Sequence, residues 1–560
     1  MRAHYPLMVE RVGRDYEAIT RRVSRDERSL YCGTADNHQY LLEPGAGSSL
    51  IVYCALAYAC EEGGYYRKKE PLDYICGACD MLLRAMHPDG TIDFLATNFY
   101  TPATFEIQAI CRAYRCFMTA FRGTEDEIRT RDRLLALMNR LGDGCLNGGF
   151  HTPNHRWVES GALMMLTNIL HRPELMEKAK GYLSEGIDCD ENGEFTERSV
   201  GCYNQVNVNS MMIMAEEGNL PELYGFVKKN LDLTFQYLDA DGTLFTKNSR
   251  RQDSGDEKFY PGHSWYYLYL WAGYLFQNKT YLKFADEIYW ASVRGGRGTP
   301  GALWLYILNP ELKTWDVDLS QTAIPTAYHA FYPASGLLRV RKDEFTYTLI
   351  AGKPDFLYVK FGEAEMTARM CASFFAVAQF EPKSVEKTDA GYRMRFTGHG
   401  EYKGLFPEPP ATSDWFQMDH SLRPVIHPCD LDFTVDLTDR EDGFQMRIRV
   451  DNTPRVPFKL EFFVPAGTRV ETNEAILDAS PDASLTVKRG NVRLENLKTG
   501  CEVTIQGLFS EHMYHYNMRG SLPPRKGMFA IYATGFSPID RVIDVRFSKR
   551  AFARAMDEKV

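Results

Sequence analysis

The sequence predicts a multi-domain α + β protein, with an N-terminal (α/α) toroid followed by a C-terminal antiparallel β-sandwich. Three observations lead to this prediction. The chain has 560 residues, more than one hydrophobic core normally serves. Apolar residues follow a helical period up to about residue 295 and a period of two from about residue 335. Turn-forming dipeptides also recur about every 50 residues in the helical part.

The helical part contains ten segments with apolar residues at helical spacing. Each segment is long enough for about three turns or more, which is typical of packed helices in a globular domain. The predicted helices lie within residues 49–62, 72–86, 104–121, 127–141, 158–170, 174–184, 204–217, 221–238, 264–276 and 282–294.

The C-terminal part contains short runs in which apolar and polar residues alternate, as in half-buried strands. Residues 318–334 have lost the helical period, and strands have not yet begun there. We therefore expect the toroid to occupy residues 1–325 and the sandwich residues 326–560. Examples of the alternating runs are residues 346–352, 356–362, 392–398, 444–450 and 458–464.

Composition narrows the class of protein. The net charge of −9 argues against nucleic acid as the main partner, because phosphate binding needs concentrated Lys and Arg. The N-terminus lacks the apolar run of a signal peptide, and the most apolar segment, residues 50–60, is too short to span a membrane. Thirteen scattered cysteines indicate reduced thiols, so we expect a cytoplasmic protein without membrane contact. Cys76 and Cys79 form a CxxC within an apolar helical run, which favours buried packing over a redox pair.

A repeat organises the helical part. Turn pairs occur at Asp89-Gly90, Asp143-Gly144, Asn192-Gly193 and Asp241-Gly242, at spacings of 54, 49 and 49 residues. We expect each pair to end a helix and to lead through a short extended loop into the next helix. A repeated unit of two helices and one such loop suits a toroid of helical hairpins, whose loops all open at one end. A plain helical solenoid is the alternative, but it does not need a polar loop in every unit.

Polar and aromatic residues gather in four such loops, residues 97–108, 148–160, 193–207 and 247–267. Loops on a rigid scaffold commonly carry binding residues, so we predict one convergent site on the toroid axis. The predicted substrate-binding residues are Asn98, Glu106, Arg156, Trp157, Arg198, Arg251, Asp253 and Trp265, together with His329 near the start of the sandwich.

Three sequence features resemble the heparinase II/III-like and alginate-lyase-like polysaccharide lyases. An Asn-His pair at the start of a toroid helix is matched by Asn154-His155. A segment of the form D-G-x-F-x-E-R-x-x-x-x-Y is similar to residues 192–203, which end at Tyr203. The family's entry into its sandwich resembles residues 331–339. The resemblance implies the toroid-plus-sandwich fold and a uronate lyase in which Tyr203 transfers the proton.

The chemistry of β-elimination explains why these residue types are suited to the task. The C5 proton beside a uronate carboxylate becomes acidic only when the carboxylate charge is neutralised, and amide or imidazole donors can do this. We assign that role to Asn154 and His155. Tyr203 is the candidate base and then acid. Glu197 and His263 are further catalytic candidates, and either Arg198 or Arg251 can grip the carboxylate through two hydrogen bonds.

Each of these residues also has a structural interpretation. In this interpretation Asn154 is a helix cap with no further role, and His155 is a packing histidine. Tyr203 is one of 32 tyrosines, most of which are expected in the core. Glu197 can bind a loop N–H group or Arg198. The Arg250-Arg251 pair can be a solvated surface pair, and Trp157 and Trp265 can pack between helices rather than stack on sugars.

Two competing functions remain open at this point. A glycoside hydrolase on the same toroid, such as a glucuronidase, needs two carboxyl groups flanking the bond. The loops offer five, namely Glu106, Glu159, Glu197, Asp253 and Asp256. A glycan-binding scaffold needs no titratable groups in four loops. The lyase and the hydrolase are both enzymes, and only the scaffold is not. We therefore expect an enzyme whose partner is a uronic-acid-containing oligosaccharide.

The sequence predicts no cofactor. Some members of the resembled group carry a structural metal in the sandwich, which leaves a metal as the alternative here. Ligand-type residues do gather in the C-terminal part, but none has the CxxC or HExxH spacing that is typical of zinc. These residues are His420, His427, Cys429 and Asp430, with His512 and His515 further on.

Overall fold

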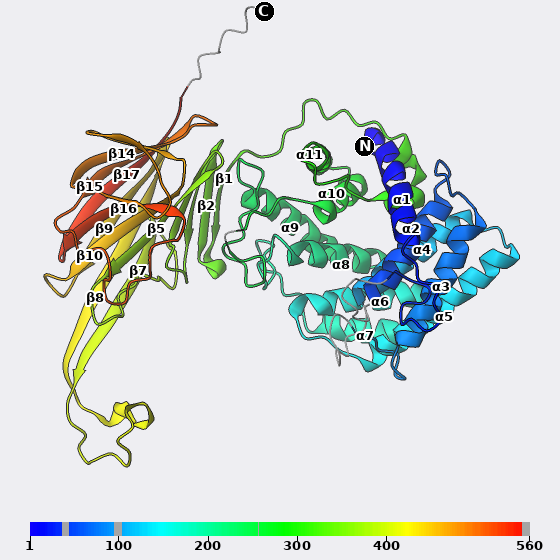
Figure 1. Cartoon of the computed structure of the whole chain (residues 1–560), viewed down its shortest axis with the longest axis horizontal. Coiled ribbons are helices and arrows are strands. Elements are labelled where there is room, and N and C mark those ends of the chain that lie inside the picture. The colour runs from blue at the N-terminus through cyan, green and yellow to red at the C-terminus, as the bar shows by residue number, and fades with distance from the viewer. Residues whose placement is uncertain (36–43, 94–103, 256, 551–560) are drawn as a thin grey trace, which may run out of the picture. The chain divides into compact units, whose positions relative to one another are not determined.

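The computed structural model describes residues 1–35, 44–93, 104–255 and 257–550. The chain forms two compact units (Figure 1). The first comprises Met1–Tyr237 and Leu244–Ile324, and the second Leu238–Thr243 and Pro325–Val560. The first unit is helical and the second is built of strands. Two residues named from the sequence, Asn98 and Asp256, lie outside the described ranges.

All ten predicted helices are present in the first unit, and two helices that the sequence analysis did not predict, α1 and α12, are added. The helix α12 is only six residues long, which is too short for a helical period to be recognised. The α-helices of the described ranges are α1 (Tyr5–Thr20), α2 (Pro44–Ala59), α3 (Lys69–Ala85), α4 (Thr104–Ala120), α5 (Glu125–Asn147), α6 (Pro153–Leu170), α7 (Pro173–Ser184), α8 (Tyr203–Glu217), α9 (Tyr224–Tyr237), α10 (His263–Phe276), α11 (Lys279–Arg294) and α12 (Leu303–Leu308).

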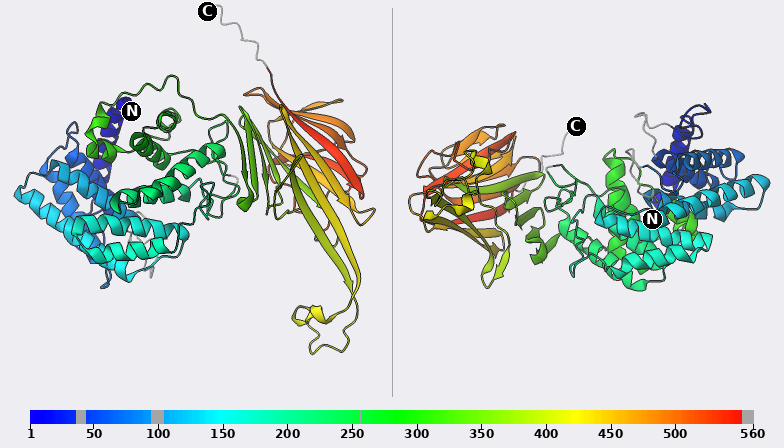
Figure 2. Two further views of the ribbon diagram at one scale, coloured as in Figure 1. Left: turned by 180° about the vertical axis from the view of Figure 1, so that it is seen from behind. Right: turned by 90° about the horizontal axis from the view of Figure 1, so that it is seen from below.

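The helices form an inner and an outer layer of a toroid. The even-numbered helices α2, α4, α6, α8 and α10 pack each against the next, and each is followed by an outer helix that packs back against it. This explains their composition, because α6 and α8 are buried around most of their circumference, whereas outer helices such as α5 and α11 have one exposed face. The helix α1 contacts α2 and α12, and α12 contacts α4. The first unit is thus an (α/α) toroid, as predicted (Figure 2).

The predicted turn at Asp143-Gly144 is wrong, because both residues lie inside α5. The other three pairs are turns, with φ of +87°, +91° and +77° at Gly90, Gly193 and Gly242. Gly144 instead allows a close approach: a Cβ placed there would lie 2.1 Å from the carbonyl oxygen of Gly90. The glycine in α5 therefore marks the place where the first turn packs against that helix.

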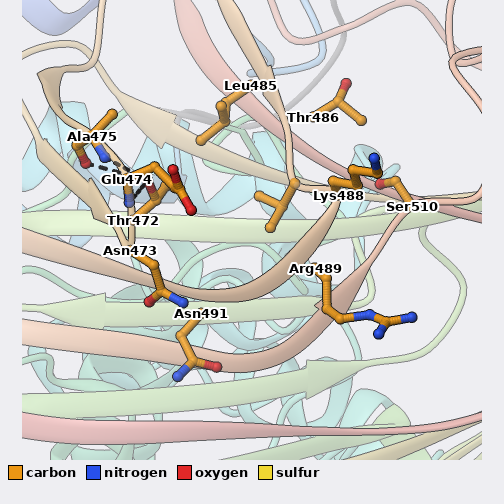
Figure 3. Close-up of a pocket in the computed structure, with 11 residues that line it drawn as sticks. Thr472, Asn473, Glu474, Ala475, Leu485, Thr486, Lys488, Arg489, Asn491 and Ser510 are labelled. Carbon is orange, nitrogen blue, oxygen red and sulfur yellow. Dashed lines mark hydrogen bonds between the residues drawn. The ribbon is translucent and has the colours of Figure 1, made fainter.

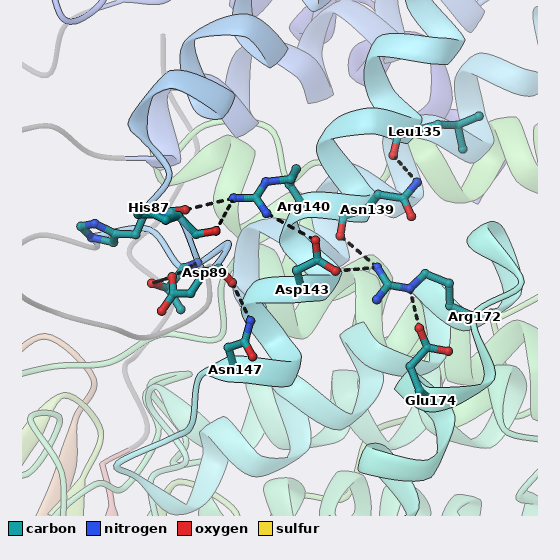
Figure 4. A network of polar contacts seen from close by, with 11 residues as sticks. His87, Asp89, Leu135, Asn139, Arg140, Asp143, Asn147, Arg172 and Glu174 are labelled. Atoms are coloured by element: carbon teal, nitrogen blue, oxygen red, sulfur yellow. Dashed lines mark hydrogen bonds and ion pairs between the residues drawn. The ribbon is translucent and has the colours of Figure 1, made fainter.

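A polar network holds the first turn against α5 (Figure 4). Arg140 donates hydrogen bonds to the carbonyl oxygens of His87 and Pro88, at 3.1 and 3.0 Å. The Asn147 amide donates to the carbonyl oxygen of Asp89 at 2.8 Å. These bonds tie the carbonyl oxygens of the turn to side chains of α5, so the loop's path depends on that helix.

Gly90→Ala is expected to lower the free energy of unfolding of the first unit by about 2–4 kcal/mol. The alanine would adopt a left-handed conformation, and its Cβ would lie 2.4 Å from the carbonyl oxygen of Arg140. The matched control is Gly123→Ala, since Gly123 has the same φ of +87° and nothing within 4 Å of the added Cβ. Urea unfolding followed by circular dichroism measures both losses. Equal losses would show that the contact with α5 contributes nothing.

The second unit is a sandwich of two sheets. The eight-stranded sheet has the order β1-β2-β3-β4-β5-β10-β16-β13, and the nine-stranded sheet β12-β11-β14-β15-β17-β9-β8-β7-β6. The strands pair antiparallel as predicted, except that the short β13 runs parallel to β16. The strands are β1 (Ala327–Tyr332), β2 (Leu337–Lys342), β3 (Phe345–Ile350), β4 (Leu357–Phe361), β5 (Ala364–Ala372), β6 (Glu386–Thr388), β7 (Gly391–Lys403), β8 (Val425–Arg440), β9 (Gly443–Asp451), β10 (Pro457–Pro465), β11 (Arg469–Thr472), β12 (Ile476–Asp478), β13 (Ser484–Thr486), β14 (Arg489–Asn496), β15 (Cys501–Phe509), β16 (Met528–Phe536) and β17 (Ile539–Lys549).

One apolar core lies between the two sheets. In β9, Phe444, Met446 and Ile448 belong to this core, while the intervening Gln445 and Arg447 do not. This alternation is the period of two seen in the sequence, because successive side chains of a strand point to opposite faces. The five alternating runs listed from the sequence coincide with β3, β4, β7, β9 and β10.

The strands β7 and β8 extend beyond the sheet as a two-stranded ribbon (Figure 1). The pairing of β8 with β9 ends at Asp432, whereas its pairing with β7 continues as far as Val425. The loop that joins the two strands exposes large apolar side chains, among them Phe416, which is 95% exposed. Arg423 lies over the Phe406 ring at 3.8 Å.

Candidate active site

Side chains from all four of the predicted loop segments meet at one end of the toroid. Phe105, in the first turn of α4, has its ring centroid 5.3 Å from that of His155 in α6. Asn154 in α6 contacts Glu197 in the loop before α8. Arg251, in the loop before α10, contacts the same carboxylate at 2.9 Å. The starts of the inner helices therefore come together at the end where the polar loops lie.

Asn154 and Glu197 form the buried base of this cluster. The Asn154 side-chain nitrogen donates to both Glu197 carboxylate oxygens, at 2.9 and 3.0 Å. It also lies 3.3 Å from the Thr152 hydroxyl. Asn154 is 0% exposed and Glu197 3% exposed. Burial raises the pKa of Glu197, although the Asn154 hydrogen bond and the charge of Arg251 lower it. The Asn154 amide is therefore placed to hold Glu197 rather than a ligand from solvent.

Arg251 links this base to Tyr203. One of its guanidinium nitrogens donates to Glu197 at 2.9 Å, and its guanidinium carbon lies 4.4 Å from the Tyr203 ring centroid. A backbone bond from the Arg250 N–H to the Glu197 carbonyl oxygen, at 3.0 Å, holds the two loops together. The Arg251 side chain is 20% exposed. Its guanidinium is therefore held by the buried Glu197 carboxylate and reaches the surface beside Tyr203.

The position of Tyr203 is set by Asp253. Tyr203 is the first residue of α8, and its N–H donates to the Ser199 hydroxyl at 3.1 Å. That hydroxyl donates to Asp253 at 2.8 Å, and the Gly201 N–H donates to the other Asp253 oxygen at 2.9 Å. Asp253 is 1% exposed, and its carboxylate accepts these hydrogen bonds from the loop before α8. These contacts favour a structural role for Asp253, and its contact with substrate stays a prediction.

His155 is a neutral imidazole at the edge of the cluster. Its pKa is lowered to about 4, chiefly by burial and in addition by the charges of the neighbouring His151 and Arg251. The ring centroids of His151 and His155 are 4.8 Å apart. The Nδ1 atom of His155 is buried and has no hydrogen-bond partner among the described residues. At neutral pH the uncharged His155 ring therefore has one N–H donor and one acceptor nitrogen.

The two tryptophans predicted to stack on sugars are buried. Trp157 is 0% and Trp265 1% exposed. The Trp157 indole donates to Asp188 at 2.6 Å, and the Trp265 indole donates to the Val200 carbonyl oxygen at 3.2 Å. Both rings are packed inside the protein, which favours the alternative interpretation of packing between helices over stacking on sugars. Arg156 lies over the Trp157 ring and pairs with Glu185 at 3.0 Å, which places it in the same structural network.

The remaining predicted residues lie around or away from the cluster. Glu106 is in the first turn of α4, next to Phe105. Arg198 has a left-handed backbone, with φ of +52°, and its pKa is lowered by burial and by Arg250. His263 begins α10 and contacts Arg11 instead of the cluster. His329 belongs to β1 of the second unit, where it contacts the Tyr392 hydroxyl at 2.8 Å.

Two contributors were not identified from the sequence. His151 stands three residues before Asn154 in the same loop, so its position was a usable signal. Ser199 links Tyr203 to Asp253, but nothing in its sequence context distinguishes it from other loop serines. The alternative interpretation of Asn154 as a helix cap is wrong, since α6 begins at Pro153 and Thr152 is its N-cap residue.

No protein-family model matches the chain, and no curated protein matches it. Solved structures do. A heparan sulfate lyase from Pedobacter heparinus is 11% identical, with a TM-score of 0.53 over 92% of this chain and 78% of the other. A Streptomyces coelicolor chondroitin AC lyase is 12% identical, with a TM-score of 0.53 over 97% and 79%. A Paenibacillus xanthan lyase is 9% identical, with a TM-score of 0.57 over 98% of this chain and 56% of the other. The chain has the fold of these polysaccharide lyases.

The sandwich unit has a pocket whose lining differs in chemistry from the toroid cluster. This pocket has a volume of about 750 Å³ and lies between the turn after β11 and the start of β14 (Figure 3). Its charged lining residues are Glu474, Lys488 and Arg489. Among its described lining residues there is no aromatic ring and no histidine, the groups that stack on sugars or transfer protons near neutral pH.

The described residues contain no group of three or more His, Cys, Asp or Glu side chains placed to hold a metal ion. All thirteen cysteines are free, and Cys79 of the CxxC is buried in α3. Within the same part of the chain, no helix combines the length and the hydropathy needed to cross a bilayer.

Proposed function

We propose that the chain is a lyase that cleaves a uronic-acid-containing polysaccharide or oligosaccharide by β-elimination. The observation that carries the proposal is the contact between Tyr203 and Arg251, with the Arg251 guanidinium supported by the buried Glu197 and Asn154. A phenol and a carboxylate-binding cation side by side are the two groups that elimination beside a uronate requires. The fold shared with polysaccharide lyases supports the same reaction class.

The reaction assigned to these residues is balanced without water. Tyr203, as the phenolate, takes the C5 proton, and the electrons of the broken C5–H bond form the C4–C5 double bond. The C4–O bond then breaks, and Tyr203 returns the proton to the departing oxygen. One side chain thus acts as base and then as acid.

Arg251 takes the role of neutralising the uronate carboxylate. The sequence analysis assigned this role to Asn154 and His155, but Asn154 is fully buried and donates to Glu197. A guanidinium binds a carboxylate through charge-assisted hydrogen bonds, which stabilise the negative charge that develops at C5. His155 remains a second donor, because its neutral ring keeps one N–H group. Asn154 and Glu197 then act as positioning residues for Arg251.

A hydrolase on this toroid receives less support. It requires two carboxyl groups that reach the glycosidic bond from either side. Glu159, Glu197 and Asp253 are at most 3% exposed. Each also accepts hydrogen bonds from the protein, Glu159 from Tyr182, Glu197 from Arg251 and Asp253 from Ser199. Carboxylates committed in this way are poorly placed to flank a sugar bond.

The test is the product of the reaction. Uronic-acid oligosaccharides are incubated with the protein, and ultraviolet absorbance and product masses are recorded. Elimination gives an unsaturated uronate that absorbs in the ultraviolet, and the product masses add up to the mass of the substrate. Hydrolysis gives saturated products whose combined mass exceeds that of the substrate by one water. Saturated products would overturn the lyase assignment.

A further inference from the structure

Exposed apolar side chains gather on the ribbon formed by β7 and β8 (Figure 1). Of the 21 large apolar side chains that are exposed among the described residues, seven lie within residues 402–426. We call residues 404–424, which join the two strands, the tip. Leu405, Phe416 and Leu422 of the tip are 86%, 95% and 62% exposed. Single exposed apolar residues are ordinary on a protein surface, but a concentration of this kind marks an interaction surface.

The tip has a fixed internal structure. Arg423 donates to the Gly404 carbonyl oxygen at 3.1 Å, and its guanidinium lies over the Phe406 ring. The Asp414 carboxylate accepts a hydrogen bond from the Phe416 N–H at 3.1 Å. These bonds hold the exposed apolar side chains in place before any partner arrives. Binding to a preorganised surface costs less conformational entropy than ordering a loose loop.

The ribbon also has an open strand edge. The strand β6 pairs with β7 only as far as Arg393. Beyond this residue, no strand of the described part of the chain pairs with the side of β7 that faces away from β8. We call residues 394–402 the free edge. Phe375 fills the space that a Cβ at Gly400 would occupy, so one face of the ribbon is already covered. The backbone N–H and C=O groups of such an edge are able to pair with another strand.

The free edge is complementary to itself when two copies run antiparallel. Pairing centred on Gly398 uses the whole free edge and places the exposed side chains of both strands on the same face. Arg395 of each copy then lies opposite Glu401 of the other, and opposite charges directly across a strand pair stabilise it. At present Arg395 is 3.8 Å from Glu386, and Glu401 is 3.1 Å from Lys403. Solvent-accessible pairs of this kind are weak and yield easily to a new partner.

The ribbon is large enough for a stable interface. A stable dimer buries about 800 Å² on each partner. Tyr402, Trp415 and Phe416 present roughly 400 Å² at their exposed fractions of 61%, 59% and 95%. The exposed aliphatic side chains and the free edge add to this area. In the antiparallel arrangement each tip lies beside the base of the other ribbon, so a second copy covers the apolar side chains of the tip.

A lipid membrane is the other kind of surface that suits exposed aromatic and aliphatic side chains. Residues 401–426 carry four acidic and only two basic side chains, which disfavours an anionic bilayer. Lipid also offers no hydrogen-bonding groups to an open strand edge. The charge and the free edge therefore favour a second copy of the chain. The charged residues are Glu401, Glu408, Asp414 and Asp419, with Lys403 and Arg423.

We propose that the ribbon is the surface through which two copies of this chain form a two-fold dimer. The free edges pair antiparallel around Gly398, and each tip is covered by the other copy. Two-fold dimers are the commonest oligomers, and such an interface uses the same residues of both subunits. The proposal is independent of the lyase function, because no residue of the Tyr203 cluster belongs to the ribbon.

The first test is a charge exchange, read by analytical ultracentrifugation over a range of protein concentrations. Arg395→Glu places like charges opposite each other twice, so the dissociation constant of the dimer should rise at least about tenfold. Arg395→Glu/Glu401→Arg makes the charges opposite again and should restore the wild-type constant. Arg541→Glu is the matched control and should dimerise as the wild type does. Arg541 lies in β17 of the same sheet and has an exposed acidic partner, Glu511, at 3.4 Å.

Three outcomes of this test would overturn the proposal. The first is a wild type that stays monomeric up to about 100 µM. The second is an Arg395→Glu variant that dimerises as tightly as the wild type. The third is a double variant whose dissociation constant is not restored.

The second test removes the apolar side chains of the tip. Leu405→Ser/Phe416→Ser should raise the dissociation constant at least about tenfold, because the apolar area is no longer gained on association. Its Tm as a monomer should match that of the wild type, since both side chains are exposed. The control is Leu30→Ser/Ile476→Ser, whose residues are each 67% exposed and lie outside the ribbon. Equal dissociation constants in the two variants would overturn the role of the tip.

Hydrogen exchange identifies the surface that is used. Raising the wild-type concentration above the dissociation constant should protect the amides of residues 394–402. A dimer that leaves these amides unprotected would overturn the paired edge. Phosphatidylcholine vesicles are the arm for the membrane. Binding of a monomeric wild type to them, lost in Leu405→Ser/Phe416→Ser, would assign the tip to a membrane and overturn the dimer.

Discussion

Replacing Tyr203 with phenylalanine is expected to lower kcat by about 10²- to 10⁴-fold, the usual contribution of a general acid–base group. KM should change little, because the hydroxyl acts mainly in the transition state. The fold should be unaffected, since the contacts that position Tyr203 are made by its backbone N–H and its ring. The measurement is the rate of ultraviolet absorbance increase at saturating substrate.

Tyr224→Phe is the matched control for this variant. Tyr224 is also half-buried and also the first residue of a helix, but it begins the outer helix α9 and packs against Phe276. It should retain wild-type kcat. Near-normal activity in Tyr203→Phe, with saturated products by mass, would instead favour the hydrolase.

Replacing Arg251 with alanine is expected to lower kcat/KM by about 10²- to 10³-fold on a charged uronate substrate. Two causes act together. The variant loses the exposed cation that faces the substrate carboxylate, and it leaves the buried Glu197 without its positive partner. The pKa of Glu197, already raised by burial, should rise further, because the guanidinium that lowers it is gone. Arg251→Lys should fall between the wild type and alanine, since it keeps the charge but loses the fork.

A methyl-esterified uronate separates charge neutralisation from a merely structural effect. The ester carries no charge, so the defect of Arg251→Ala should largely disappear on that substrate. The neighbouring Arg250→Ala is the matched control, because Arg250 is exposed and its side chain donates weakly to the Thr196 carbonyl oxygen. A defect of equal size on the charged and esterified substrates would remove Arg251 from the carboxylate site.

Some of the candidate site was predictable because it depends on local sequence. Each of the four residues lies either in a polar loop or at the start of the inner helix that follows such a loop, and the sequence repeat predicted that these loops lie at one end of the toroid. The four residues are Asn154, Glu197, Tyr203 and Arg251. Their contacts with one another confirm that the loops meet. The division of labour among them was not predictable. Whether Asn154 faces a substrate or Glu197 depends on burial, and burial is set by neighbours distant in sequence.

The tryptophans and the Asp143-Gly144 pair are two further cases in which neighbours distant in sequence decided the role of a residue. Trp157 stands in a polar loop region, as a sugar-stacking residue would, but its indole pairs with Asp188 inside the protein. The sequence pattern predicts a turn at Gly144, but this residue lies within α5. A glycine is needed there because the backbone of Gly90 occupies the space of a Cβ. Glycine is suited both to turns and to close backbone contacts, and tryptophan both to sugar stacking and to core packing. The sequence pattern does not distinguish between these roles.

The sequence by itself determined the class and order of the structural units, since periods of 3.6 and 2 follow directly from helix and strand geometry. It also determined which loops hold the polar residues. The tertiary structure alone decided that Arg251 stays partly exposed while Asn154 is buried, and that His263 contacts Arg11 and not the Tyr203 cluster. Both outcomes depend on which side chains remain exposed after packing, and that depends on contacts between residues as far apart as Arg11 and His263.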